Sequence, residues 1–163
     1  MNNFSKLPVI AIVISISILL IGCSATSKLN PGTPAPYTKL QRLDDSSYIL
    51  LENLRGKMVG LLFWESTCSA SKSMLSSLNE HARKLHNRSD LAFIAVSSDT
   101  NEEDLRNLIH VRNYNAVTHA YSGNGGYDEA FLAFRVDSVP QGFIIDRNGV
   151  IVDSGTPDWE LIK

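Results

Sequence analysis

The chain has 163 residues, with 15 lysine or arginine and 17 aspartate or glutamate side chains, which gives a formal net charge of −2 at pH 7. Without a basic surplus, the composition does not support nucleic-acid binding. The length suits one domain that buries its core without disulfide staples. The two cysteines and four histidines lack metal-ligand spacing, so we expect no metal site, no cofactor and surface histidines.

The first 22 residues have the pattern of a targeting segment. Lys6 precedes an apolar run over residues 7–21, which is short for a helix that crosses a membrane. The run ends in LIGCS at residues 20–24, which resembles the lipobox of bacterial lipoproteins. The resemblance implies that residues 1–22 are a lipoprotein signal peptide and that Cys23 carries a lipid. An uncleaved anchor helix is the alternative.

Either form attaches the domain to a membrane of the bacterial cell envelope. Ser24 differs from the aspartate that retains lipoproteins at the inner membrane, which favours a periplasm-facing domain on the outer membrane. Residues 23–36 are rich in Ser, Thr, Pro and Gly and have no apolar period, so they predict a linker before a domain at 37–163. Cys68 is then left without a disulfide partner.

The domain alternates between strand and helix patterns. Strands are expected at 37–43, 48–51, 58–64, 91–97 and 117–121, and the continuous apolar run MVGLLFW at 58–64 indicates a strand buried on both faces. Helices are expected at 52–55, 69–85, 101–111 and 127–134. Strands 141–146 and 150–154, around the turn 147–149, predict a hairpin. Strands separated by helices indicate parallel pairing with right-handed crossovers.

Four stretches resemble the thioredoxin-like superfamily, in particular the extracytoplasmic TlpA and ResA type and the related redoxin (AhpC/TSA) domains. They are GTPAPYTKLQRLDD (32–45), LENLRGKMVGLLFW (51–64), CSASKSML (68–75) and VDSVPQGFIIDRNGVIV (136–152). The resemblance implies an α/β fold with a central mixed sheet, helices on both faces and a C-terminal β-hairpin. Because the family normally adds a closing helix, we expect residues 158–162 to cover the sheet poorly.

The resemblance also implies thiol-disulfide oxidoreductase chemistry. Cys68 matches the first cysteine of the family's strand-to-helix site, and Ser71 stands where the second cysteine would be. Pro140 matches a cis-proline that lies beside the active cysteine and pairs its backbone with an extended substrate. The implied catalytic group is Cys68, Ser71 and Pro140. The implied substrate contacts are Trp64, Thr67 and Val139.

Elementary chemistry supports a reactive Cys68. At the start of a helix, free backbone N–H groups and the positive end of the dipole favour the thiolate. Ser71 can donate a hydroxyl hydrogen bond to that thiolate, whereas a carboxylate at Glu65 raises the thiol pKa. The alternative is a buried cysteine that acts as a small hydrophobic residue.

Several residues depart from the family pattern. Leu62 and Met74 stand where relatives have proton-shuttling acids, and no second thiol can resolve a mixed disulfide. We therefore expect a single-cysteine reaction with client thiols or disulfides and an external resolving thiol. The main alternative is a binding or assembly lipoprotein that has lost the chemistry. A one-cysteine peroxidase is a minor alternative, because Glu65 and Leu61 replace the threonine and proline that it needs.

Overall fold

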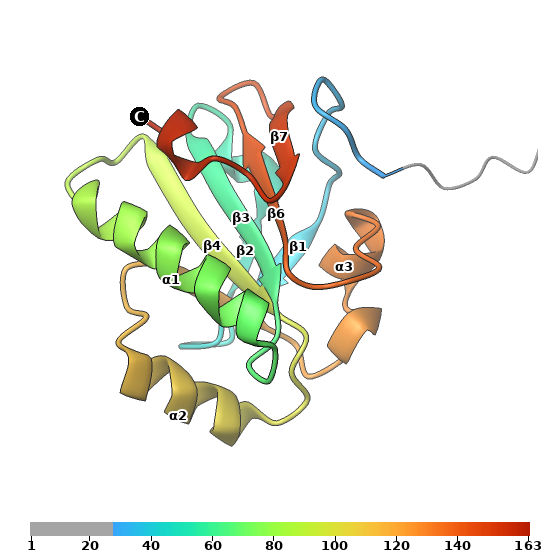
Figure 1. The fold of residues 1–163 in the computed structure, drawn as a ribbon. Coiled ribbons are helices and arrows are strands. Elements are labelled where there is room, and N and C mark those ends of the chain that lie inside the picture. Colours follow the sequence, from blue (N-terminus) through green and yellow to red (C-terminus); the bar gives the residue numbers. More distant parts are fainter. Residues whose placement is uncertain (1–27) are drawn as a thin grey trace, which may run out of the picture.

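The computed structural model describes residues 28–163, so the expected signal peptide and the lipidated Cys23 lie outside the described residues. Five strands form the central sheet in the order β5-β4-β3-β6-β7 (Figure 1). They are β3 (Met58–Trp64), β4 (Leu91–Ser97), β5 (Thr118–Tyr121), β6 (Gln141–Ile145) and β7 (Ile151–Gly155). The first three run parallel, and β6 and β7 join in antiparallel orientation. The predicted mixed sheet and C-terminal hairpin are confirmed.

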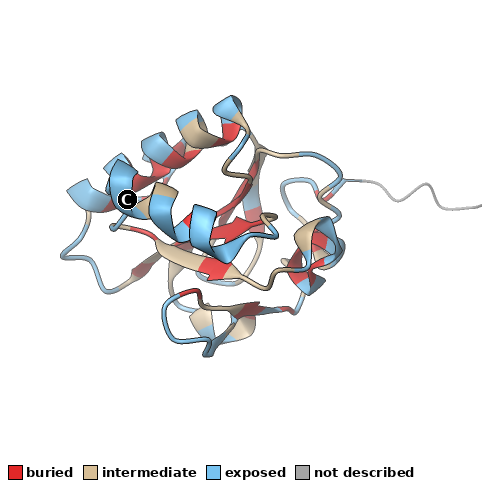
Figure 2. Ribbon diagram, turned by 90° about the horizontal axis from the view of Figure 1, so that it is seen from below, coloured by how far each residue is buried: buried red, intermediate tan, exposed pale blue. Residues whose placement is uncertain are grey.

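Helices cover both faces of this sheet. The two long helices α1 (Ser69–Lys84) and α2 (Glu102–Arg112) lie on one face, and the short α3 (Glu129–Ala133) lies on the other (Figure 1). Alternate side chains of β3 point to opposite faces of the sheet. Phe63 packs in the core cluster that includes α3, and Leu62 packs in the cluster that includes α1 and α2. Figure 2 shows that the buried residues line the inner sides of the helices.

Smaller elements complete the domain. The strands β1 (Lys39–Gln41) and β2 (Tyr48–Leu50) form a separate antiparallel pair, followed by the 3₁₀ turn η1 (Leu51–Leu54). The Leu43 N–H donates to the His119 carbonyl at 2.9 Å and so joins this pair to the edge strand β5. Two further 3₁₀ turns are η2 (Gly125–Tyr127) and η3 (Trp159–Leu161). Within residues 28–163, no helix has the length and apolar character needed to cross a membrane.

The domain begins earlier than the expected boundary at Tyr37. The Gly32 N–H donates to the Ile151 carbonyl at 2.8 Å, and the Ile151 N–H donates to the Thr33 carbonyl at 2.9 Å. Leu29 is 9% exposed and belongs to the core. Residues 29–35 therefore pack along β7 as part of the fold. The prediction of a linker over 23–36 is wrong for residues 29–35, because backbone hydrogen bonds to the β7 region and burial of Leu29 hold these residues on the domain.

The C-terminal segment covers the sheet better than expected. Ile162 is fully buried, Trp159 is 5% exposed, and both belong to the core cluster that includes α1. A Cβ atom built on Gly142 would come within 2.7 Å of Pro157 and 2.9 Å of Trp159. The expectation of poor coverage is wrong, because these apolar side chains close the sheet without a full helix.

The expectation that all four histidines lie at the surface is also wrong. His81 is 6% exposed, and its Nε2 lies 2.9 Å from the Ile162 carbonyl oxygen. Part-buried His119 lies on β5 with its Nε2 2.6 Å from the Tyr114 carbonyl oxygen. Desolvation lowers the pKa of His119, so the neutral ring is favoured there. Both side chains hold backbone segments in place.

Candidate functional site

Cys68 lies where the central strand β3 gives way to helix α1. The strand ends at Trp64, and a tight turn follows in which the Cys68 N–H donates to the Glu65 carbonyl at 3.2 Å. Cys68 is the N-cap residue of α1 and has extended backbone angles, φ −81° and ψ 121°. Its side chain is half-buried. The predicted position of the thiol at a helix start is therefore confirmed.

Asp99 fixes this turn from the neighbouring strand. Its carboxylate accepts hydrogen bonds from the Ser66 N–H at 3.1 Å and from the Ser66 hydroxyl. It also accepts from the Ser97 hydroxyl at the end of β4. Asp99 was not predicted from the sequence, although a signal for it exists. Adjacent parallel strands end at the same edge of a sheet, so a polar residue just after β4 belongs beside the turn after β3.

The first turn of α1 stabilises the thiolate form of Cys68. The Ser71 side chain is the largest influence that lowers the pKa of the Cys68 thiol below its ordinary value, and the backbone N–H groups of Ser71 and Ala70 act in the same direction. Ser71 is fully buried, and among residues 28–163 its Oγ has no hydrogen-bond partner. The hydroxyl is therefore available to donate to the thiolate.

Acidic groups contribute little to this site. The negative charge of Glu65 raises the pKa of Cys68, but it is the smallest of the influences on that thiol. The Glu65 carboxylate instead accepts a hydrogen bond from the Thr67 hydroxyl at 2.7 Å. Leu62 is fully buried, and Met74 packs against the core on the α1 side. Neither position supplies a carboxylate that could take a proton from a thiol.

The loop before β6 forms the other wall of the site. The Val139–Pro140 peptide bond is cis, as the resemblance implies. Because Phe63 on β3 is paired with Gln141 on β6, Pro140 lies at the edge of the sheet where the Cys68 turn begins. A groove of about 280 Å³ lies between the loop of residues 136–139 and Glu65 of the Cys68 turn. It is lined by Glu65, Ser98, Gly126, Phe131, Val136, Asp137, Ser138 and Val139.

The three expected substrate contacts differ in accessibility. Thr67 is exposed beside Cys68, and half-buried Val139 lines the groove, so both can meet a client. Trp64 is fully buried in the core cluster on the α1 side. Its assignment as a substrate contact is wrong, because as the last residue of β3 it points into the packed interior and fills the space between the sheet and α1.

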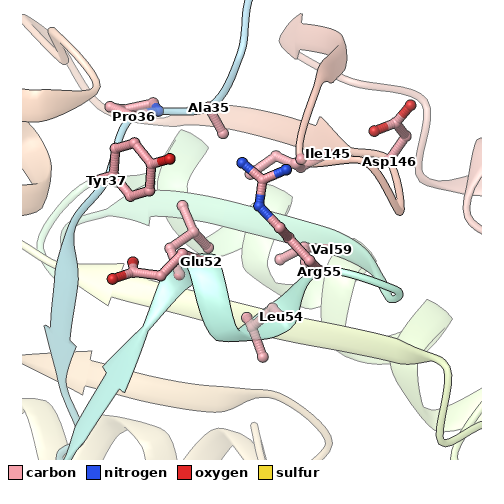
Figure 3. Close-up of a pocket in the computed structure, with 11 residues that line it drawn as sticks. Ala35, Pro36, Tyr37, Glu52, Leu54, Arg55, Val59, Ile145 and Asp146 are labelled. Atoms are coloured by element: carbon pink, nitrogen blue, oxygen red, sulfur yellow. The ribbon is translucent and has the colours of Figure 1, made fainter.

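Figure 3 shows another cavity, which is lined by none of the residues of the Cys68 site. It is bounded by residues 35–37, by η1 and by the start of the β6–β7 turn, and it holds about 20 Å³. This is room for about one water molecule, so the cavity is too small for a substrate. Within residues 28–163, no group of three or more His, Cys, Asp or Glu side chains could hold a metal ion.

Comparisons with known proteins agree with this geometry. A family model described as thioredoxin-like matches residues 56–151, which include the Cys68 turn, Pro140 and most of the sheet. No curated protein matches the sequence.

Several solved structures with the same fold come from Bacteroides species. The thioredoxin domain of a thiol-disulfide oxidoreductase from Bacteroides vulgatus is 20% identical with a TM-score of 0.68, covering 78% of this chain and 89% of that one. A thiol-disulfide oxidoreductase from Bacteroides fragilis is 17% identical with a TM-score of 0.69, covering 77% and 92%. A thiol:disulfide interchange protein from Bacteroides sp. is 19% identical with a TM-score of 0.69, covering 82% and 86%. At these identities the likeness concerns the fold.

Proposed function

Because the chain belongs to the thioredoxin-like family, we propose that it is a thiol-disulfide exchange protein that acts through a single cysteine, Cys68. One observation carries the proposal. Cys68 is the N-cap residue of α1, and the buried Ser71 side chain and two backbone N–H groups of the first turn lower the pKa of its thiol. A buried inert cysteine would have neither this access nor these donors.

The reaction proceeds in two exchange steps. The Cys68 thiolate attacks one sulfur of a client disulfide, the client S–S bond breaks, and the released client thiolate takes up a proton from solvent. The product is a mixed disulfide between Cys68 and the client. An external thiol then attacks the Cys68 sulfur and releases the second client thiol, and a further external thiol regenerates Cys68. In sum, one client disulfide is reduced and two external thiols are oxidised to a disulfide.

Ser71 explains why an outside thiol is required. A cysteine at this position would attack the mixed disulfide from within the same helix turn, whereas a hydroxyl donates a hydrogen bond and does not displace sulfur. The same step accepts a client sulfenic acid, in which case hydroxide is the leaving group and the mixed disulfide is again the product. The groove beside Val139 is the place for the extended client segment.

The proposal includes a location in the bacterial cell envelope. The lipobox-like LIGCS pattern supports a lipid on Cys23, and Ser24 supports attachment to the outer membrane with the domain in the periplasm. An oxidising compartment suits a protein that meets client disulfides. The proposed partners are client proteins, a small or protein-borne external thiol, and the membrane.

The test is the reaction of the purified, reduced full-length chain with a disulfide-containing peptide, followed by intact mass. We expect a 1:1 adduct on Cys68 that persists until glutathione is added and is absent in Cys68→Ala. If the chain forms the adduct no faster than free cysteine does, the result would instead support a binding or assembly lipoprotein. That second candidate is favoured by apolar Leu62 and Met74, which leave the site without a proton acceptor.

A further inference from the structure

The tether between the anchor and the domain is short. Residues 29–35 are held to β7 by backbone hydrogen bonds and by burial of Leu29, so they cannot act as a spacer. Residues 24–27 alone separate Cys23 from the first described residue, Lys28. Five residue steps span at most about 17 Å, whereas the 14 steps from Cys23 to Tyr37 would span about 50 Å.

The tether meets the domain beside the candidate site. Lys28 Nζ lies 4.0 Å from Asp137 Oδ1, and Asp137 lies three residues before Pro140. Both side chains are exposed, so this ion pair adds little stability. The ion pair shows that the tether ends next to the loop of residues 136–139, which forms one wall of the groove. Glu65 of the Cys68 turn lines another part of the same groove.

We propose that this attachment holds the groove and Cys68 close to the bilayer, so that the clients are disulfides of proteins carried by the same membrane. The inference rests on the proposed function and on anchoring at or before Cys23. It holds equally for a lipid on Cys23 and for an uncleaved anchor helix, because the same four residues follow Cys23 in both. A client disulfide far from the bilayer would lie beyond the reach of a tether of this length.

Effective concentration makes the proposal measurable. Two groups confined near one surface by a flexible tether react faster than free groups, and the advantage falls roughly as the −3/2 power of tether length. Lengthening the tether from five to 25 residue steps should therefore lower the rate of reaction with a disulfide at the bilayer surface by roughly tenfold. If the site faced away from the membrane, the longer tether would raise that rate.

The experiment uses the full chain in proteoliposomes that contain a phospholipid whose headgroup carries a pyridyl disulfide. Attack by Cys68 forms a mixed disulfide with the lipid and releases pyridine-2-thione, which is followed by absorbance. A Cys68→Ala chain is the blank and removes the contribution of a Cys23 thiol that carries no lipid. The variant carries 20 Gly and Ser residues between Ser27 and Lys28. The matched control carries the same insertion after Asn87, in the exposed loop between α1 and β4.

A water-soluble pyridyl disulfide separates the possible failures. We expect the soluble probe to react equally with all three proteins and the lipid probe to react roughly tenfold more slowly only with the lengthened tether. An unchanged or faster lipid reaction with the lengthened tether would overturn the proposal. A soluble reaction no faster than that of free cysteine would refute the proposed function instead, and a chain that fails to join the vesicles would refute the anchoring.

Discussion

Ser71 lies in the first turn of α1, three residues after Cys68, and its side chain is the largest influence that lowers the pKa of the Cys68 thiol. The Ser71 hydroxyl is buried and has no hydrogen-bond partner within residues 28–163. Ionisation of Cys68 gives that hydroxyl an acceptor. A sulfur anion at an N-cap position also takes the acceptor role that Ser or Asp side chains usually fill at helix starts. The residue that removes the dithiol cycle is thus the residue that most favours the thiolate.

Replacing Ser71 by alanine should raise the pKa of Cys68, because the largest stabilising influence on the thiolate is lost. The thiolate fraction at neutral pH falls, so we expect a several-fold slower reaction with iodoacetamide at pH 7. At high pH, where the thiol of both proteins is ionised, the two rates should converge. A constant difference across the whole pH range would mean that Ser71 acts on access to the sulfur instead.

Replacing Ser71 by cysteine should restore a resolving thiol at i+3 from Cys68. The mixed disulfide with a peptide should then no longer accumulate, because the second thiol displaces the client and leaves an internal disulfide. Intact mass before and after alkylation measures the loss of two hydrogens. Persistence of the same adduct in Ser71→Cys would show that the first turn of α1 cannot bring position 71 to the bound sulfur.

Replacing Gly142 by alanine should destabilise the domain by about 1–3 kcal/mol through overpacking. The new methyl group would meet ring atoms of Pro157 at 2.7 Å and of Trp159 at 2.9 Å. Urea unfolding gives the free energy. Gly126→Ala is the matched control, since nothing lies within 4 Å of its added Cβ, and it should change stability by less than about 0.5 kcal/mol. Equal stability of both variants would contradict the observed packing of the C-terminal segment.

Replacing Leu29 by alanine should cost about 2 kcal/mol of unfolding free energy if residues 29–35 belong to the fold. Leu29 is 9% exposed in the core, whereas its neighbour Lys28 makes only an exposed ion pair. Lys28→Ala is therefore the control and should change stability by less than about 0.5 kcal/mol. A Leu29→Ala protein as stable as the parent would restore the longer linker and remove the basis for a short tether.

Much of the fold could be predicted from the sequence because most runs of apolar residues have the same bounds as the strands and helices in the structure. The run from Met58 to Trp64 gave its strand bounds correctly, since every residue in it faces one of two buried layers. The assignment of Trp64 as a client contact came from the family resemblance and went against this pattern. A residue that ends a strand buried on both faces continues the core, and its aromatic character did not make it a client contact.

The features that were not predicted depend on contacts that the pattern of apolar and polar residues does not reveal. The segment 29–35 contains one apolar side chain of note, Leu29, and is held by backbone pairing to β7 that no residue type reveals. For His81 a signal was present: it lies three residues after Leu78 and one before Ala82, within the buried stripe of α1. Trp159 and Ile162, three residues apart, likewise indicated one helical turn with a buried side.

The most direct test of single-thiol chemistry is the rate of Cys68 alkylation as a function of pH in the reduced full-length chain, with Cys68→Ala as the blank. The donors of the first α1 turn lower the thiol pKa, so the midpoint should lie below the ordinary cysteine value of about 8.5. The rate at pH 7 should accordingly exceed that of a free cysteine peptide. A midpoint at or above 8.5 would contradict the account and leave a binding protein that keeps the fold without the reaction.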